Sequence, residues 1–383
     1  MGDRNVAENF TALAQSMRII NRYLLKELAG PFFASLFVST FILAAGNIMQ
    51  TADMIMNKGV EIGYVVKIFL LFLPYVLIFT IPISVLSAVL LGFGRLSSDN
   101  EVTALRTSGI SLRKMIFPVI ICGFIVSLIS IPLNDKILPQ SEFAARKLIK
   151  KIGMKHPTAL LEPGVFVKGF KNYVVFIHGV KGDILQDIRI YQPREDGPTR
   201  TIVAKRGEII PLPDENRVKL KLEDGMADEV IADRPDEFYK LSFQEYHMTL
   251  DLDETVDVNS IGKKAREKSI KELLADIEEM RDMKDIKGGD IPLRIEMHKK
   301  LAIAFSNLVF VLMGIPLAIT THRREKFIGF ALAMALFLLY WGFMLGGIAF
   351  AIRGVIPPWA GVWSADIVLF IVGSVMLCKV TVR

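Results

Sequence analysis

The chain has 383 residues, of which 52% are hydrophobic and 22% are charged, and its formal net charge is +6. Its mean hydropathy is +0.41. A soluble domain rarely combines positive mean hydropathy with so many charges unless the two are segregated along the chain. The composition therefore excludes a wholly soluble globular protein and indicates membrane-spanning segments separated by polar ones.

Six apolar runs have the roughly 18–20 residues that a membrane-spanning helix needs. They are Phe32–Met49, Val65–Phe93, Met115–Leu133, Leu301–Thr320, Phe327–Ile352 and Trp359–Cys378. A long polar region, from Asn134 to Lys300, separates the third run from the fourth. The N-terminus has no apolar signal-peptide core, so we expect a mobile cytoplasmic tail before the first span. The predicted layout is three spans, a soluble insert and three further spans.

Basic residues in the short connecting segments predict the orientation of these spans. They gather at Arg18, Arg22, Lys26, Arg95, Arg106, Arg113, Lys114, Arg323, Arg324, Lys326, Lys379 and Arg383. The short loops on the other side hold little more than Lys58 and Arg353. Under the positive-inside rule both termini are cytoplasmic, and the polar insert lies in the periplasm of a bacterial cell.

The polar insert combines short β-type runs with one helical segment. The β-type runs are Gly164–Phe170, Tyr173–Ile177, Ile184–Tyr191, Thr201–Ile210, Val218–Leu222 and Phe238–Leu250. Turn residues separate them, including Glu223-Asp224-Gly225, and this pattern favours an antiparallel sandwich or open barrel. From Glu267 to Met283 the apolar period becomes helical. A binding sheet and an inert spacer remain equally open from these residues alone.

Motifs for catalysis or energy conversion are absent from the sequence. There is no G-x-x-x-x-G-K-[ST], no G-x-S-x-G and no H-E-x-x-H, and the five histidines have no metal-ligand spacing. The two cysteines form no C-x-x-C pair. We expect Asp366, early in the sixth run, to be hydrated, so the spans lack the midplane charges of an ion-driven carrier. We predict a protein that is not itself an enzyme, has no cofactor or metal, and takes energy for any transport from a partner.

The segment between the second and third runs is more structured than a turn requires. Ser98 or Asp99 can cap the N-terminus of a helix there, and Gly109 can end it. Glu101 and Leu105 are four residues apart and share a face, and an acidic residue in the first turn suits the helix dipole. The segment is either a solvated turn or a helix that docks on a cytoplasmic partner.

Several motifs resemble those of one family. They are Arg22-Tyr23-Leu24, Leu73-Pro74, Ile81-Pro82, Ser98-Asp99-Asn100-Glu101-Val102-Thr103-Ala104-Leu105-Arg106, Glu296-x-His298-Lys299-Lys300, Gly314-Ile315-Pro316-Leu317 and Pro357-Pro358. From about Met17 onward the chain is similar to the LptF/LptG (YjgP/YjgQ) family of lipopolysaccharide export permeases. Gly164-Val165-Phe166, Val174–Ile177 and Phe243-Gln244-x-Tyr246 favour an LptF-like member. Asn100 stands where the family often has Ser.

The resemblance implies an α-helical membrane protein with six transmembrane helices and an inserted all-β, β-jellyroll-like periplasmic domain. It implies pairing with the paralogue (LptG if this is LptF), attachment to an LptB ATPase dimer, and contact with LptC. Lipopolysaccharide would pass from the outer leaflet of the inner membrane to the jellyroll domain. The loop helix would meet the ATPase through Asp99, Glu101, Leu105 and Arg106.

Lipopolysaccharide recognition needs cations around an apolar cavity at headgroup height. The cations in suitable positions are Lys58, Lys67, Arg294, Lys299, Lys300 and Arg353, although each can also simply reach the membrane interface. Phe166, Val175 and Phe176 are expected to line the jellyroll interior.

The expected domains are a tail (1–28), spans with a coupling helix at about 97–109 (29–133), the β-domain (134–260), a helical linker (261–298) and the last spans (299–383). A different class of function stays open. The alternative is a non-transporting inner-membrane sensor or scaffold whose periplasmic domain binds an envelope component.

Overall fold

The computed structural model describes residues 2–56, 60–155, 164–170, 172–181, 184–194, 197–212, 217–231, 234–251, 262–282, 289–321 and 326–382. The chain forms two compact units. The helical unit comprises Met1–Ala45, Leu73–Glu142 and Lys264–Arg383, and the sheet unit comprises Gly46–Phe72 and Phe143–Lys263.

Six helical stretches of the described chain are long and apolar enough to cross a membrane. The first three belong to α1 (Gly2–Met56), α2 (Ile62–Ser98) and α4 (Leu112–Pro132), and the last three to α7 (Ile291–Thr321), α8 (Lys326–Ile352) and α9 (Pro358–Val382). This confirms the predicted class, a helical membrane protein with three spans on each side of an insert.

Helix α1 has no break where a separate N-terminal tail was expected to end. The helix is continuous from Gly2, and the stretch suited to spanning begins at Ile19. The tail predicted for residues 1–28 therefore overlaps the spanning helix. Hydropathy marks where a helix can enter the membrane, whereas polar residues of good helix propensity can continue the same helix outside it.

The third span also continues beyond its apolar run. Helix α4 passes through a π-helical turn, η1 (Leu133–Ile137), into α5 (Leu138–Lys155). The insert therefore opens with a helix, and the β-domain boundary predicted at residue 134 lies too early. The polar composition of α5 hides it from a hydropathy profile, because only its amphipathic period indicates a helix.

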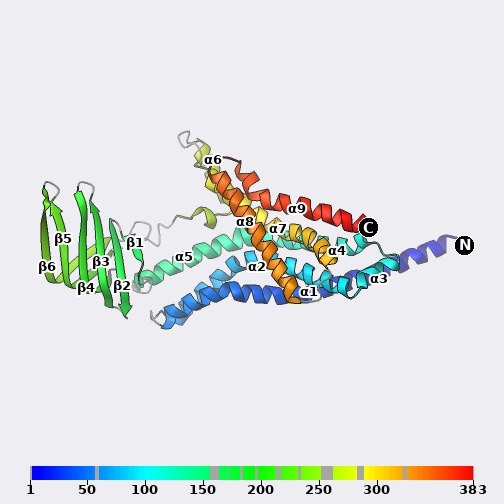
Figure 1. The fold of residues 1–383 in the computed structure, drawn as a ribbon, viewed down its shortest axis with the longest axis horizontal. Coiled ribbons are helices and arrows are strands. Elements are labelled where there is room, and N and C mark those ends of the chain that lie inside the picture. The colour runs from blue at the N-terminus through cyan, green and yellow to red at the C-terminus, as the bar shows by residue number, and fades with distance from the viewer. Residues whose placement is uncertain are drawn as a thin grey trace. The chain divides into compact units, whose positions relative to one another are not determined.

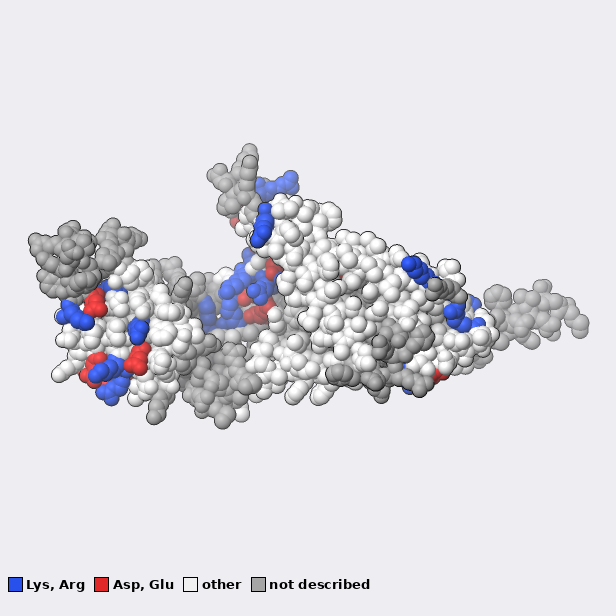
Figure 2. All heavy atoms as spheres, viewed as in Figure 1, with Lys and Arg blue, Asp and Glu red and all other residues white. Residues whose placement is uncertain are grey.

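The core of the helical unit is built from all six spanning helices. Large side chains such as Leu24, Phe93, Met115 and Ile315 are fully enclosed within it. Apolar residues on the outer faces stay exposed, for example Phe37 at 74%. Over the middle of the helical unit, the described side chains visible in Figure 2 are uncharged. Such a surface is expected where lipid is the solvent.

Asp366 does not lie in a hydrated position. Its relative exposure is 3%, and Tyr340 on α8 donates a 3.4 Å hydrogen bond to its carboxylate. The expectation of a hydrated carboxylate is therefore wrong.

Helix α9 also packs closely against α7. A Cβ added at Gly373 would lie 3.0 Å from the backbone nitrogen of Met313, so a larger residue there would crowd the α7 backbone.

The sheet unit contains six antiparallel strands in sequential order, drawn side by side in Figure 1. They are β1 (Phe166–Phe170), β2 (Tyr173–Lys181), β3 (Ile184–Arg194), β4 (Gly197–Leu212), β5 (Arg217–Ile231) and β6 (Arg234–Asp251). All six predicted strands are confirmed. The break predicted at Glu223–Gly225 is wrong, because β5 continues through it with Asp224 at a φ of 52°.

One face of the sheet carries the apolar core of this unit. Val175, Ile177, Leu185 and Leu220 are among the residues buried there, at 0–2% exposure. Since side chains alternate between the two faces of a strand, the buried residues belong to one face only. The six described strands follow one another in the sheet without a crossover, whereas a jellyroll is built from Greek-key connections.

The linker after the sheet contains the predicted helix. A single 3₁₀ turn, η5 (Ala265–Glu267), precedes α6 (Ile270–Asp282). Leu273 and Ile277 of α6 pack with Leu293 of α7. The amphipathic stripe seen in the sequence is thus used to attach α6 to the helical unit.

Candidate functional site

The loop between α2 and α4 contains a short helix, α3 (Glu101–Thr107), that begins after a one-residue reversal. Asn100 provides the reversal, with φ 59° and ψ 14°, and its side chain makes no capping bond. The prediction of a Ser98 or Asp99 cap is therefore wrong, and the Ser98 hydroxyl instead donates to the Arg95 carbonyl oxygen at 3.3 Å. Asn tolerates the left-handed region better than most residues, so its presence here has a structural reason.

The C-terminus of α3 ends as the sequence predicts. Gly109 has a φ of 85°, and its N–H donates to the Arg106 carbonyl at 3.0 Å. The N–H of Ile110 reaches back to the Leu105 carbonyl at 3.1 Å. This pair of bonds is a Schellman motif, which satisfies the last carbonyls and fixes where the helix stops.

One face of α3 is anchored in the helical unit and the other is exposed. Val102 is 5% exposed, and Leu105 packs against the same core cluster. Thr103, Ala104 and Arg106 are exposed on the opposite side. A seven-residue helix is too short to be stable alone, so the buried face holds it while the outer face is available for a partner.

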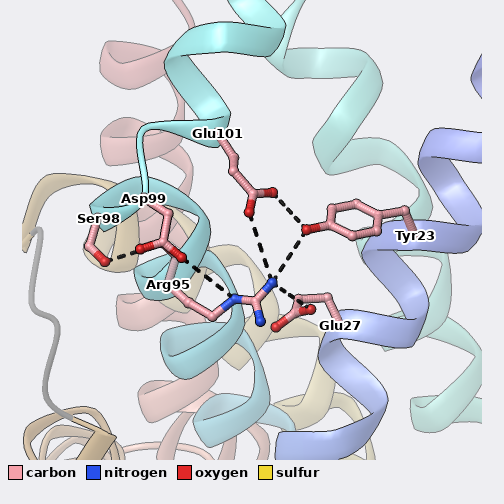
Figure 3. Close-up of polar contacts among 6 residues, drawn as sticks. All are labelled: Tyr23, Glu27, Arg95, Ser98, Asp99 and Glu101. Atoms are coloured by element: carbon pink, nitrogen blue, oxygen red, sulfur yellow. Dashed lines mark hydrogen bonds and ion pairs between the residues drawn. The ribbon is translucent and has the colours of Figure 1, made fainter.

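Arg95, in the last turn of α2, is the centre of a charged cluster that sequence reasoning missed (Figure 3). Its guanidinium is 2.8 Å from the carboxylate of Glu27, 3.9 Å from that of Glu101 and 4.0 Å from that of Asp99. It also donates to the Tyr23 hydroxyl at 3.3 Å, and Tyr23 in turn donates to Glu101 at 2.7 Å. We call these five residues the Arg95 cluster.

The charges of the Arg95 cluster do not balance. Three carboxylates surround one guanidinium, and their side-chain exposure rises from 18% for Glu27 to 35% for Glu101 and 49% for Asp99. The excess negative charge is therefore on the exposed side, next to the outer face of α3. Such a surface is electrostatically complementary to a basic partner group.

The predicted ATPase-contact residues divide between the two faces of α3. Asp99 and Arg106 are exposed, whereas Leu105 is partly buried against the core. Glu101 is half-buried, with one carboxylate oxygen bonded to Tyr23. Tyr23 could be found from the sequence, because it belongs to the Arg22-Tyr23-Leu24 motif. Arg95 carries no such signal beyond its place among the basic residues of the loop.

The predicted headgroup cations differ in their exposure and in their ion pairs. On α7, Arg294 lies 2.6 Å from Asp290, and Lys299 lies 2.6 Å from Glu296. Lys67 and Arg353 are exposed, and Lys58 lies outside the described residues.

Lys300 is buried at 5% exposure instead of facing a headgroup. Its ammonium donates to the Asn134 carbonyl oxygen, in the π-helical turn, at 3.1 Å. The next residue along that turn, Asp135, accepts a 2.6 Å hydrogen bond from the N–H of Ile270, at the start of α6. A π-helical turn interrupts the regular bonding of a helix, so Lys300 and Asp135 use it to join α4 to α7 and α6.

The three residues expected to line the sheet interior do not share a face. Val175 is buried in the core, whereas Phe166 is 55% exposed and its ring packs against that of Phe176, with 4.9 Å between centroids and an interplanar angle of 44°. Phe166 pairs with Phe176 in the register of β1 and β2. The placement of Phe166 and Phe176 in the interior is therefore wrong, because adjacent residues on a strand point to opposite faces.

Comparison with known proteins gives a consistent result over nearly the whole chain. Residues 22–379 match the sequence model of the family described as lipopolysaccharide export system permease LptF/LptG. The chain is similar to the lipopolysaccharide export system permease protein LptF of Escherichia coli strain K12, with 22% identity over 367 residues. That alignment covers 94% of this chain and 94% of the relative. The proteins of the same name from Escherichia coli O157:H7 and Shigella flexneri match with the same identity and coverage.

Proposed function

The chain belongs to the lipopolysaccharide export permease LptF/LptG family, and from this premise we propose a specific role. It is the transmembrane permease subunit of an ATP-powered lipopolysaccharide exporter. A separate cytoplasmic ATPase supplies the energy, since the sequence holds no nucleotide-binding loop of its own. The observation that carries the proposal is the family match over residues 22–379, which includes both sets of spans and the loop helix.

The loop helix α3 is the proposed contact with the ATPase. Its exposed face is available to bind the ATPase, and its buried face is packed against the membrane helices. A movement of the ATPase would therefore be passed through α3 to those helices. The basic residues of the short loops support a cytoplasmic location for α3. Asp99 and Glu101, which is only loosely paired with Arg95 at 3.9 Å, would meet a basic group of the ATPase, and Arg106 would meet an acidic or polar one.

The proposed substrate is lipopolysaccharide in the outer leaflet of the inner membrane. Its acyl chains would enter an apolar cavity shared with a paralogous permease subunit, and then pass to the sheet unit and on to LptC. Lys67 and Arg353 are the exposed cations proposed for its phosphates. Arg294 and Lys299 can bind a phosphate only if they leave the carboxylates of Asp290 and Glu296, with which they are paired. Lys300, being buried, is withdrawn from this set.

Co-purification tests the contact with the ATPase. The permease pair, carrying a tag on this chain, is extracted in mild detergent together with the ATPase. We expect Arg106→Glu to reduce the amount of ATPase recovered, because it reverses the charge on the exposed face of α3. Arg113→Glu, a charge reversal at another exposed arginine that lies outside α3, is the matched control and should retain the ATPase. If no ATPase is recovered with the unaltered chain, the proposal fails.

A further inference from the structure

The Arg95 cluster connects three helices through one hydroxyl group. Tyr23 and Glu27 are four residues apart on α1 and therefore share a face. Arg95 lies in the last turn of α2, and Glu101 begins α3. The Tyr23 hydroxyl accepts a hydrogen bond from Arg95 and donates one to Glu101, so it links the end of α2 to the start of α3.

The α1 side of the cluster is the more enclosed side. Glu27 is only 18% exposed and holds the Arg95 guanidinium at 2.8 Å. Beside it, Leu24 and Leu28 are buried in the core of the helical unit. A Cβ at Gly92 would collide with the Leu28 side chain, so α1 and α2 approach closely here. Arg95 is thus held firmly to α1, whereas its 3.9 Å contact with Glu101 is the looser one.

We propose that Tyr23 is a positioning residue that transmits the movement of α3 to the first membrane span. The proposal rests on the proposed function, in which an ATPase moves α3. When α3 shifts, Glu101 pulls on the Tyr23 hydroxyl and thereby on α1. The ring of Tyr23 and the Arg95–Glu27 pair keep the direction of that pull fixed. Helix α1 in turn presents apolar residues such as Phe37 on its outer face, so its displacement alters a surface of the membrane domain.

This role differs from a docking role. Tyr23 is 40% exposed, but its hydroxyl is directed at Glu101 and Arg95 and is occupied by hydrogen bonds within this chain (Figure 3). Loss of the hydroxyl should therefore leave the ATPase bound and active. It should lower the amount of lipopolysaccharide released per ATP hydrolysed, because α3 would move without carrying α1 with it.

Tyr23→Phe tests the proposal, since it removes the hydroxyl and keeps the ring. The complete complex is reconstituted in proteoliposomes with lipopolysaccharide, and three quantities are measured: ATPase affinity, ATP hydrolysis, and lipopolysaccharide released to an acceptor. We expect unchanged affinity and hydrolysis, with a fall of about fivefold in release per ATP, the factor that corresponds to one typical hydrogen bond. Tyr75→Phe is the matched control, because it removes a hydroxyl from α2 about 30 Å along the helix from Arg95.

A second variant keeps the test independent of any folding defect. Glu27→Gln loosens Arg95 and should lower release per ATP in the same direction. The double variant Tyr23→Phe/Glu27→Gln should be no worse than the more affected single variant, because both act through one connection.

Three results would overturn the inference. One is Tyr23→Phe matching Tyr75→Phe in release per ATP, and another is full additivity in the double variant. The third is an equal loss of ATPase binding and transport in Tyr23→Phe, which would make the cluster part of the docking surface. Absence of ATP-dependent release by the unaltered complex would instead refute the proposed function, so the two failures can be told apart.

Discussion

Substitution of Glu101 distinguishes most clearly between a role inside this chain and a role in binding the ATPase. Within the chain, the carboxylate of Glu101 lies 3.9 Å from the guanidinium of Arg95. Both side chains are more than a third exposed. An ion pair with that exposure contributes at most about 1 kcal/mol. Loss of the charge alone can therefore change the affinity for the ATPase by no more than about fivefold through effects inside this chain.

Glu101→Gln removes this charge and retains an oxygen that can accept the Tyr23 hydrogen bond. If Glu101 meets a basic group of the ATPase, the substitution leaves that group unpaired at an interface. Such losses cost about 2–5 kcal/mol, which is about 30-fold or more in affinity. We expect Glu101→Gln and Glu101→Ala to weaken binding similarly, measured as the dissociation constant of the detergent-solubilised permease pair for the ATPase.

The comparison of the two variants also shows how the reasoning would fail. Nearly unaltered affinity for Glu101→Gln, together with weak binding for Glu101→Ala, would mean that Glu101 acts only through Tyr23. Salt supplies a second check, because a charge contact at a partly exposed interface weakens as ionic strength rises. The affinity of the unaltered chain should fall with salt more steeply than that of Glu101→Gln.

Two further predictions concern stability. Lys300→Met removes the ammonium that donates to the Asn134 carbonyl oxygen, and we expect it to destabilise the helical unit by about 1–3 kcal/mol. The loss should appear as a lower unfolding temperature in detergent, and an unchanged or higher temperature would contradict the assigned contact. In the sheet unit, the Lys221 ammonium lowers the pKa of Glu245 by charge attraction. The carboxylate form is thus favoured by folding, and its contribution is present above the ordinary pKa of about 4.3 and is lost as the pH falls through the lowered value. Lys221→Met should flatten the acid limb of a pH–unfolding profile, and an identical profile would exclude this ion pair as a source of acid sensitivity.

The sequence predicted those features that depend on neighbouring residues. Apolar runs of spanning length located six membrane helices, and β-type runs between turn residues located six strands. Gly109 ended α3 as expected, because a left-handed residue is a local requirement. The β5 break failed for the opposite reason: the strand is kept in the sheet by its pairing with β4 and β6, which overrides the local turn signal.

The contacts between distant parts of the chain could not be predicted. Glu27, Arg95 and Glu101 carry no signal of mutual proximity, because their contact depends on how α1, α2 and α3 pack. The burial of Lys300 likewise depends on a π-helical turn that hydropathy does not reveal. The interior placement of Phe166 and Phe176 is a different kind of error. Val175 and Phe176 are adjacent on one strand, so the alternation of side chains alone excludes a shared face.

ATP-dependent release of lipopolysaccharide is the measurement that tests the central claim most directly. The chain is reconstituted with its paralogue and the ATPase in proteoliposomes that contain lipopolysaccharide, and transfer to a soluble periplasmic acceptor is followed with and without ATP. The account predicts transfer that needs ATP, the ATPase and this chain together. Transfer at the same rate without ATP, or none in the complete complex, would contradict it.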